Sequence, residues 1–399
     1  MADRTHVVVI GGGYAGVMAA NRLTRRDDVA VTLVNPRRTF VERIRLHQLV
    51  GGSDDAVVDF REVLADSVRL TVDQVTRIDT AGRRLTLASG GTVGYDYLIY
   101  AVGSGSATPE VPGVAEYAHP VTSLEEAQRL REVVAAAPPT TPVAVVGAGP
   151  SGIETAAELA EAGRTVTLVC GGTLGPYLHP RARRSVARRL AALGVTVVDG
   201  PDTTVTAVTA DAVHLRDGRE VPATVTVWTA GFGVPDLAAR SGLSTDTLGR
   251  LRTDETLTSV DDVRVVAAGD SAAPSDLPFR MSCQAAMQMG PQAAETVLSR
   301  IAGGQPAPVD VGFAGQCLSL GRRAGLMQLA RRNDTVTVLH LGGRTGARLK
   351  EFVVRNIVAQ LAYEARRPGR RNRWIRDGRR RAALRSRQGA APVTVDRVA

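Results

Sequence analysis

Two glycine-rich segments carry the most informative chemistry in this 399-residue sequence. Residues 11–16 read Gly-Gly-Gly-Tyr-Ala-Gly and residues 147–152 read Gly-Ala-Gly-Pro-Ser-Gly, so both fit the pattern G-x-G-x-x-G. In this pattern the first glycine makes a tight turn, the second lets the backbone approach a pyrophosphate, and the third lets a helix pack closely on a strand. Each segment therefore predicts a site where a negative pyrophosphate meets the positive N-terminus of a helix.

The residues around each motif have the order of strand, helix and strand that such a site requires. In the first unit a β-rich run precedes the motif, an Ala-rich helical pattern follows it, and a second β-rich run comes next, at 6–10, 17–26 and 29–34. The second unit repeats this order at 143–146, 153–162 and 165–169. One such motif is weak evidence, but two in full context imply two dinucleotides. They predict electron transfer between a flavin and a nicotinamide.

The composition indicates a globular protein of about two or three domains. No run approaches the roughly 18 apolar residues that a membrane span needs. The first strand begins too early for a signal peptide, so we expect a cytoplasmic location. Cys170, Cys283 and Cys317 are far apart and the six histidines are scattered, which argues against a disulfide framework and a metal site.

The net charge of +9 is confined to the C-terminal end. From Arg366 onward the chain has 12 Arg against only Asp377 and Asp396, so the residues before it are almost neutral. Trp374 is the only aromatic residue of this tail, whereas stacking on nucleic acid needs several, and we expect no nucleic-acid binding. Lys350 is the only lysine among the 49 basic residues.

Taken together with three further segments, the glycine motifs resemble those of flavoproteins with two dinucleotide-binding domains, the glutathione-reductase-like fold. The further segments are a strand that ends at a glycine turn (95–103), Thr-Ala-Gly-Phe-Gly-Val-Pro at 229–235 and Val-Val-Ala-Ala-Gly-Asp at 265–270. The resemblance covers about residues 6–365. It implies an α/β fold of two Rossmann-like domains, with the NAD(P) domain inserted in a split FAD domain, and a small C-terminal α+β region.

This resemblance divides the chain into five segments. We expect the FAD domain at 1–118 and 253–305, the NAD(P) domain at 119–252, a C-terminal region with an amphipathic helix at 306–366, and an Arg-rich, disordered tail at 367–399. The last helix is predicted over 348–365. One of its faces is expected to carry Leu349, Phe352, Val353, Ile357 and Leu361, with Lys350 elsewhere.

The segment 283–290 points to one branch of this family. Disulfide reductases of the fold carry a cysteine pair beside the flavin, whereas the corresponding residues 40–48 contain no cysteine. Residues 283–290 resemble the A-Q-x-A-x-Q motif of type II NADH dehydrogenases, whose glutamines line the quinone pocket. Gln284 and Gln288 share a helix face and could bond one quinone carbonyl and its surroundings. The alternative is an ordinary core helix with both glutamines solvated.

Two carboxylates are predicted at the cofactors. Glu154 follows the second motif, and the resemblance implies a place near the nicotinamide and flavin, with a role in cofactor contact or proton transfer. A carboxylate in that helix turn is also a favourable dipole partner, which alone would account for it. Asp270 follows Gly269 at a strand end, where it could accept bonds from the flavin ribityl hydroxyls. A simple N-cap is the alternative.

The residues that should read the adenosine ribose depart from the usual acid. The place holds Asn35 in the first unit and Cys170 in the second. Without the acid at Cys170 the repulsion of a 2′-phosphate is lost, so the sequence leaves NADH and NADPH open, with NADH favoured by the resemblance. Cys170 and Cys317 are similar to the cysteine pair of sulfide:quinone oxidoreductases, but inert buried thiols are the favoured interpretation.

The sequence predicts two groups of site residues. The catalytic residues are Glu154, Gln284 and Gln288. The cofactor-binding residues are Gly11, Gly13, Tyr14, Ala15, Gly16, Asn35, Arg43, Gln48, Val75, Ala101, Gly103, Gly147, Gly149, Gly152, Cys170, Gly231, Gly269 and Asp270. No metal ligands are predicted.

The sequence thus predicts an FAD-dependent NAD(P)H oxidoreductase that passes a hydride from the nicotinamide to flavin N5 and then electrons to a quinone-type acceptor. A reductase for a ferredoxin- or rubredoxin-type protein and a flavin-binding redox sensor are the alternatives. The C-terminal helix and Arg-rich tail are expected either to contact the inner membrane surface or to form a dimer or domain contact.

Overall fold

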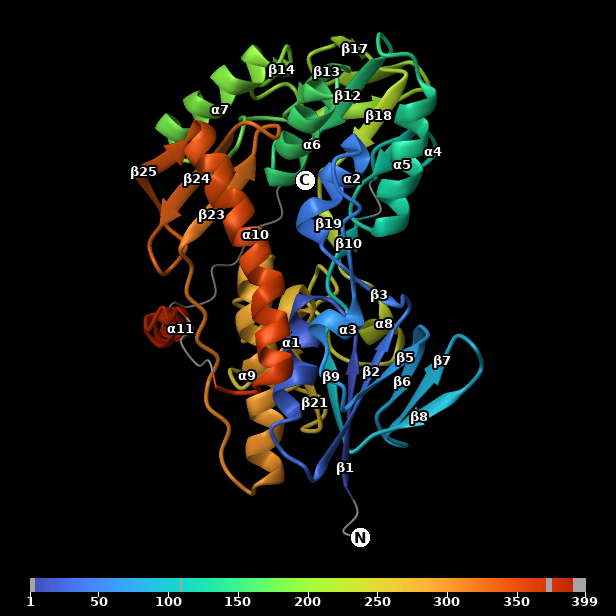
Figure 1. The fold of residues 1–399 in the computed structure, drawn as a ribbon, viewed down its shortest axis with the longest axis vertical. Helices are drawn as coiled ribbons and strands as arrows, with labels where there is room; N and C mark the ends of the chain where they lie inside the picture. Colours follow the sequence, from blue (N-terminus) through green and yellow to red (C-terminus); the bar gives the residue numbers. More distant parts are fainter. Residues whose placement is uncertain (1–3, 108–109, 371–374, 390–399) are drawn as a thin grey trace.

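The computed structural model describes residues 4–107, 110–370 and 375–389, and its main feature is two parallel sheets placed one above the other along the long axis (Figure 1). The lower sheet has the order β21-β9-β1-β2-β5 and only parallel pairings. Its strands are β1 (Thr5–Ile10), β2 (Val29–Asn35), β5 (Val68–Val72), β9 (Tyr97–Tyr100) and β21 (Val265–Ala267). Central strands covered on both faces read as continuous apolar runs, and the valines of β1 are fully buried.

Helices α1 (Tyr14–Leu23) and α9 (Cys283–Ile301) pack against each other beside this sheet. They come close at Gly290, where a Cβ would lie 2.2 Å from the carbonyl oxygen of Ala15, so a side chain there would drive the helices apart. An antiparallel sheet of β6 (Val75–Asp79), β7 (Arg84–Leu87) and β8 (Thr92–Gly94) contributes to the same core. These elements bring the N-termini of α1 and α9 to the upper side of the lower sheet (Figure 1).

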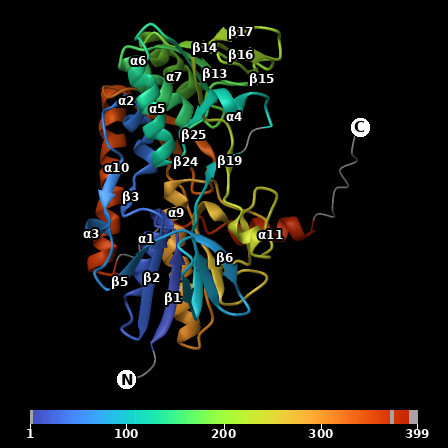
Figure 2. The same cartoon turned by 90° about the vertical axis from the view of Figure 1, so that its right-hand side faces the viewer.

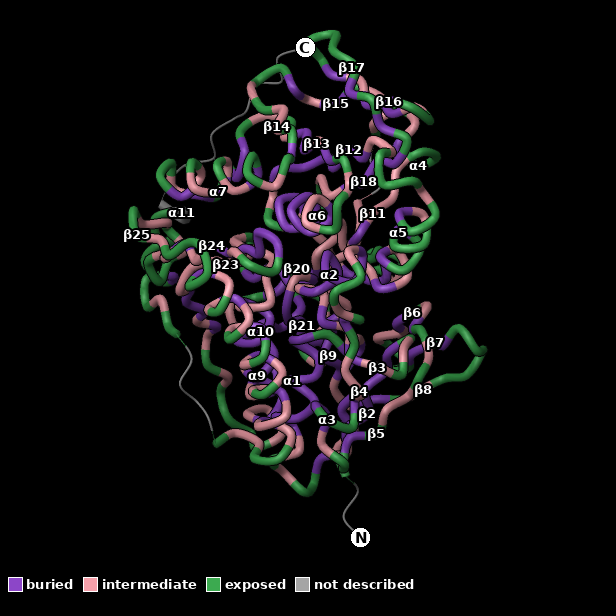
Figure 3. The backbone as a smooth tube through the Cα atoms, turned by 45° about the horizontal axis from the view of Figure 1, so that its top comes forward, coloured by how far each residue is buried: buried purple, intermediate pink, exposed green. Residues whose placement is uncertain are grey.

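The upper sheet repeats the parallel architecture with the order β11-β18-β12-β13-β14. Its strands are β11 (Ala118–Pro120), β12 (Pro142–Val146), β13 (Thr165–Val169), β14 (Thr196–Val198) and β18 (Val225–Trp228). Helices α5 (Leu124–Ala136), α6 (Pro150–Glu161) and α7 (Pro180–Ala192) accompany it, as does an antiparallel sheet of β15 (Val205–Val208), β16 (Ala212–Leu215) and β17 (Glu220–Pro222). Buried residues follow the sheets and the helices against them (Figure 3).

The upper unit interrupts the lower one in the sequence. Strand β21 pairs with β9 in the lower sheet, although the whole upper sheet lies between them along the chain. The two crossings run side by side, because β10 (Gly105–Ser106) pairs antiparallel with β19 (Phe232–Gly233). The inserted arrangement of two Rossmann-like units is therefore as predicted. The residue boundaries of the domains remain our own division.

The C-terminal region consists of an antiparallel sheet and a long helix. Strands β23 (Gly315–Ser319), β24 (Gly325–Ala330) and β25 (Val336–Gly342) form the sheet. Helix α10 spans Gly343–Arg366 and so begins five residues before the predicted start. It contacts α1 and the sheet of β23 to β25, and it runs past both units (Figure 1).

The predicted apolar face of α10 is only partly buried within the chain. Ile357 and Leu361 are buried, whereas Phe352 is 65% exposed. Lys350, which was placed off this face, is only 7% exposed. The apolar pattern alone does not reveal that this lysine is buried, because the lysine is held by a buried partner from another element. Contact of α10 with a membrane or with a second copy remains a prediction.

The prediction of a disordered tail is wrong for residues 375–389. Helix α11 (Arg380–Gly389) lies in this segment and projects outward from the side of the lower unit in the side view (Figure 2). Arg380 is buried and its guanidinium bonds both carboxylate oxygens of Glu255 at 2.7 and 2.9 Å. The ion pair fixes the start of this helix to the lower unit. Residues 371–374 and 390–399 of the predicted tail lie outside the described residues.

Short elements complete the fold. They are β3 (Thr39–Val41), β4 (Val57–Asp59), β20 (Leu251–Thr253), β22 (Ala272–Pro274), α2 (Leu46–Gly51), α3 (Phe60–Val63), α4 (Val114–Tyr117), α8 (Leu237–Arg240) and the 3-10 turns at Arg43–Arg45 and Gly269–Ser271. Within the described ranges, no helix has the length and apolarity that crossing a membrane would take.

Candidate active site

The first glycine motif has the geometry that a pyrophosphate site needs. Gly11 has φ +100°, and a Cβ there would lie 2.3 Å from the carbonyl oxygen of Ala101. A Cβ on Gly16 would lie 1.8 Å from the carbonyl oxygen of Gly11, so the third glycine lets α1 sit against the turn. At Gly13, the N-cap of α1, a Cβ would meet nothing within 4 Å. This open space in front of a helix N-terminus is where the backbone can receive a phosphate.

The second motif repeats these relations at the N-terminus of α6. Gly147 has φ +116°, and a Cβ on Gly152 would lie 1.8 Å from the carbonyl oxygen of Gly147. Gly149, the N-cap of α6, again faces open space. The three physical roles predicted for the glycines are therefore present twice. Both sites fit a dinucleotide.

A cavity of about 1240 Å³ joins the second motif to the lower unit. Its lining includes Gly147 and Gly149 of the second motif, Asp270, and residues of the first two turns of α9. Several predicted site residues line it together, namely Tyr14, Arg43, Gly147, Gly149, Glu154, Cys170, Gly231, Asp270, Gln284 and Gln288. The hydroxyl of Tyr14 is buried, and Tyr14 lines this wall of the cavity.

Gln48 and Val75 do not line this cavity. The side-chain oxygen of Gln48 accepts a hydrogen bond from Arg45 at 2.9 Å, and Val75 is buried in β6 opposite Leu87. Gln48 therefore supports the ion pairs of Arg45 rather than facing the cavity. Cofactor contact at these two residues stays a prediction.

Asn35 supports the glycine turn itself. Its side-chain oxygen accepts the backbone N–H of Gly12 at 2.9 Å, and its amide donates to the carbonyl of Arg37 at 2.8 Å. Asn35, at the end of β2, thus fixes the backbone of the first glycine motif at Gly12. Its predicted contact with a ribose would use the remaining amide hydrogen or lone pair.

Asp270 connects three parts of the lower unit. Its carboxylate accepts the hydroxyl of Ser104 at 2.7 Å and the backbone N–H of Ser282 at 3.1 Å. Arg43 lies 3.9 Å away and also donates to Ser104. Asp270 is not the N-cap of its own short helix, because Ala268 holds that position. It instead fixes the turn after β9 and the start of α9 on one wall of the cavity.

The two predicted glutamines fix a loop as well as lining the cavity. Gln288 is 4% exposed, and its amide donates to the carbonyls of Gln284 at 3.0 Å and Gly312 at 2.9 Å. The amide of Gln284, oriented to suit its neighbours, donates to Gly315 and accepts from Ala314, both at 3.2 Å. Gln288 is not solvated, so the alternative of two solvated glutamines is wrong. Its side-chain oxygen is buried and has no partner within the described residues.

Glu154 forms a buried ion pair that the sequence did not reveal. Lys350 on α10 places its ammonium 2.9 Å from Oε1 of Glu154, and the exposed fractions of the two side chains are 9% and 8%. The same oxygen accepts the backbone N–H of Ser319 at 2.8 Å. Oε2 lies 3.8 Å from Nδ1 of His47. Both Lys350 and His47 line the cavity and were missing from the predicted site.

The environment of this cluster sets its charge states. Burial alone would raise the pKa of the Glu154 carboxyl, but the Lys350 ammonium and its other partners hold that pKa below the ordinary value. Burial alone would lower the pKa of Lys350. The Glu154 carboxylate has the larger opposite effect, so the pKa of Lys350 is raised. Burial lowers the pKa of His47 to about 4, so its ring is neutral at neutral pH. The cavity wall therefore holds an ionised pair beside a neutral imidazole.

The three cysteines are free thiols that all line the cavity. Burial raises the pKa of Cys170 to about 12 and that of Cys283 to about 11, and it also raises the pKa of Cys317. Thiolates are the reactive form of cysteine, so these thiols are poor nucleophiles at neutral pH. The arrangement supports inert thiols. No group of three or more side chains suited to a metal ion occurs in the described ranges.

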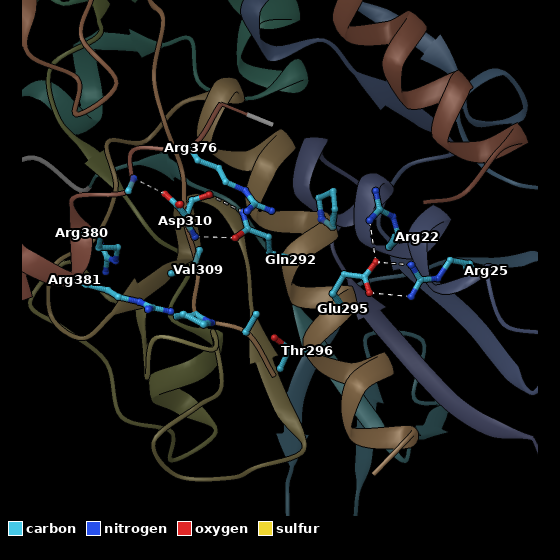
Figure 4. A pocket seen from close by; sticks show the side chains of 14 residues that line it. Arg22, Arg25, Gln292, Glu295, Thr296, Val309, Asp310, Arg376, Arg380 and Arg381 are labelled. Atoms are coloured by element: carbon cyan, nitrogen blue, oxygen red, sulfur yellow. Dashed lines mark hydrogen bonds and ion pairs between the residues drawn. The ribbon is translucent and has the colours of Figure 1, made fainter. Parts of the chain in front are cut away.

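A second cavity, of about 520 Å³, lies between α9 and the segment that leads into α11 (Figure 4). Figure 4 shows Glu295 between Arg22 and Arg25, which bond it at 2.9 to 3.0 Å. Asp310 accepts the backbone N–H of Asp377 at 2.9 Å and so attaches the C-terminal segment. Neither glycine motif contributes to this lining, and the candidate active site is therefore the larger cavity.

Comparison with known proteins decides the family. The family model described as pyridine nucleotide-disulphide oxidoreductase matches residues 5–290. The chain belongs to this family. A NADH dehydrogenase-like protein of Mycobacterium tuberculosis is 33% identical over 326 residues, which are 74% of this chain and 80% of that protein. The family implies binding of FAD and NAD(P)H, and the two glycine sites described above fit such ligands.

Other relatives lie in the same branch. A type II NADH:quinone oxidoreductase of M. tuberculosis is 28% identical over 349 residues, 76% of this chain and 74% of that protein. The structure of NDH2 from Plasmodium falciparum has a TM-score of 0.75 at 16% identity, covering 92% of this chain and 99% of the other. At that identity the likeness shows the fold alone. This family member is a pyridine nucleotide-dependent flavin oxidoreductase close to the NADH dehydrogenase-like branch.

Lys350 and His47 show what sequence reasoning missed. Lys350 had one available signal, because a chain that uses Arg at 48 of 49 basic positions keeps a single lysine. An ammonium is a compact point charge, whereas a guanidinium is a planar fork, and the two are not interchangeable in a tight buried pair. His47 gave no comparable signal. Its place became visible only when α2 and α6 were brought together.

Proposed function

We propose that this flavoprotein passes electrons from a nicotinamide nucleotide to a quinone-type acceptor. One observation supports this most strongly: a single cavity is lined both by the second glycine motif and by Gln284, Gln288 and the Glu154–Lys350 pair. Donor and acceptor would then reach the same space from opposite ends. Bound FAD would supply the two-electron transfer between them. The overall reaction consumes one proton, because NADH, a quinone and a proton give NAD⁺ and a quinol.

Glu154 is the residue we assign to that proton. Its Oε1 is occupied by Lys350 and Ser319, whereas Oε2 has no hydrogen bond within the described residues and faces His47. Oε2 is therefore the atom that can accept a proton from solvent and return it to a reduced acceptor. Lys350 keeps the carboxylate ionised between turnovers despite its burial.

The glutamines are assigned to the acceptor. Gln288 holds residue 312 in place through its amide, and its buried side-chain oxygen remains available to a hydroxyl of the reduced acceptor. Gln284 fixes residues 314 and 315 at the start of β23. Loss of either amide would loosen this wall, so both residues position the acceptor as well as lining its space.

Anaerobic mixing tests the proposal. The purified yellow protein is mixed with NADH or NADPH, and a short-chain quinone is then added while the visible absorption of the flavin is followed. We expect rapid bleaching followed by recovery on quinone addition. The variant E154Q should bleach normally and recover slowly, whereas E220Q, which alters an exposed carboxylate remote from the cavity lining, should match the unaltered protein.

The other results separate the alternatives. Bleaching that no quinone reverses, but that a small iron–sulfur protein reverses in a salt-dependent way, would show a protein acceptor instead. Bleaching that no acceptor reverses would indicate a redox sensor. A colourless protein that binds no added FAD would contradict the flavoprotein assignment itself.

A further inference from the structure

The end of strand β14 lies beside the position that lacks the ribose-binding acid. Strands β13 and β14 are parallel and pair Thr167 with Thr196 through Val169 with Val198. The backbone N–H of Cys170 donates to the carbonyl of Val198 at 2.8 Å, so the register continues beyond the last strand residues. Position 170 is therefore next to position 199. In a parallel pair, side chains at matched positions project from the same face of the sheet.

Position 199 is an aspartate. Burial raises the pKa of the Cys170 thiol to about 12, and the Asp199 carboxylate adds to this effect, which agrees with their adjacency. No arginine contributes to the shift at Cys170. Arg183 of α7, an arginine that follows this loop in the sequence, donates to the carbonyl of Leu178. The charged group that acts on Cys170 is thus the Asp199 carboxylate.

The surroundings leave this carboxylate accessible to a ligand. Asp199 is exposed, and its side chain has no hydrogen bond or ion pair to any residue in the described ranges. The loop after β13 is open, because a Cβ on Gly171 or Gly172 would meet nothing within 4 Å. The backbone N–H of Gly200 donates to the carbonyl of Gly172 at 2.8 Å. This bond ties the two loops together and keeps Asp199 beside Cys170, which lines the larger cavity.

We propose that Asp199, from the neighbouring strand, replaces the missing acid, bonds the adenosine ribose hydroxyls of NADH, and rejects NADPH by repelling its 2′-phosphate. A carboxylate can accept from a 2′-hydroxyl, whereas a phosphate at the same place would bring two like charges together. The inference rests on the proposed function in one respect, that a nicotinamide nucleotide binds at the second glycine motif. It makes the chain an NADH enzyme despite Cys170.

Binding of nucleotide fragments tests the inference without relying on turnover. The purified full-length protein is titrated calorimetrically with ADP-ribose and with 2′-phospho-ADP-ribose. We expect the unphosphorylated fragment to bind more tightly. Asp199→Asn should reduce the preference for ADP-ribose over 2′-phospho-ADP-ribose by about tenfold, chiefly because the phosphorylated fragment binds more tightly. Asp202→Asn removes the same charge from a nearby exposed position and should leave the ratio unchanged.

A second variant guards against an indirect effect. Adding Cys170→Asp to Asp199→Asn puts an acid back at the usual position and should restore the preference for ADP-ribose. An equal loss of affinity for both fragments in Asp199→Asn would mean that Asp199 contacts the adenine instead, and would overturn the inference. An unchanged ratio would overturn it as well. If neither fragment bound to any variant, the nucleotide site of the proposed function would fail first.

Discussion

Replacing Lys350 by methionine removes one charge of the buried ion pair while keeping most of the side-chain volume. The ammonium lies 2.9 Å from the carboxylate of Glu154, and both side chains are at most 9% exposed, so solvent screens the pair only weakly. Removing one partner of such a pair leaves a buried charge and costs about 3–5 kcal/mol. We expect Lys350→Met to lower the free energy of unfolding by about that amount at neutral pH.

The double variant provides the matched control. Glu154→Gln together with Lys350→Met removes both charges and leaves no buried ion, and replacement of a whole buried pair is often close to neutral. The double variant should therefore be more stable than Lys350→Met alone. Urea unfolding at constant temperature measures each free energy, and the four proteins form a double-mutant cycle. Additive effects of the two substitutions would refute the ion pair.

The pH dependence of stability provides an independent test of the ion pair. In the natural protein the pKa of Glu154 is below its ordinary value, so the pair stabilises the fold above that value, and the stabilisation is lost as pH falls through the folded-state pKa. In Lys350→Met burial raises the pKa of Glu154 instead, and ionisation opposes folding. This variant should gain stability relative to the natural protein as pH falls from neutral to about 5. A parallel pH profile would contradict the reasoning.

Three further predictions concern other parts of the site. Gly13→Ala keeps an allowed φ of −84° and its added Cβ meets no protein atom, so the protein should fold normally but bind less flavin, which visible absorbance measures. Gly16→Ala should instead destabilise the fold, which thermal unfolding measures. Burial lowers the pKa of His47 from 6.5 to about 4, so the free energy of unfolding should fall by about 3 kcal/mol as pH decreases from 6.5 to 4. Urea unfolding of His47→Gln should lack this decrease. Arg380→Ala should speed hydrogen exchange of 375–386 without affecting the rest, and unchanged exchange would show that Glu255 does not hold this segment.

The glycine motifs could be predicted from sequence because their function is local. Each glycine acts on backbone atoms a few residues away, or on the adjacent strand end at Ala101, so spacing alone encodes the turn. The insertion of one unit in the other was expected from the family resemblance, which the segment 265–270 helps to carry.

The partner of Glu154 could not be predicted in the same way. Lys350 is far away in the sequence, and the two meet only because α10 packs across the sheet of β23 to β25. An apolar pattern on α10 indicates a buried face. It does not indicate which polar residue is buried there because a carboxylate on a neighbouring element pairs with it. The tail was misread for a related reason, since its Arg-rich composition conceals that Arg380 has a buried acid to pair with.

A crystal structure of the flavin-loaded protein with a non-reacting quinone analogue would test the central claim most directly. The account predicts the analogue in the larger cavity, within contact of Gln284 and Gln288, with the second glycine motif left open for the nucleotide. An analogue bound elsewhere, for example in the arginine-lined cavity beside α11, would contradict the claim that one cavity serves donor and acceptor.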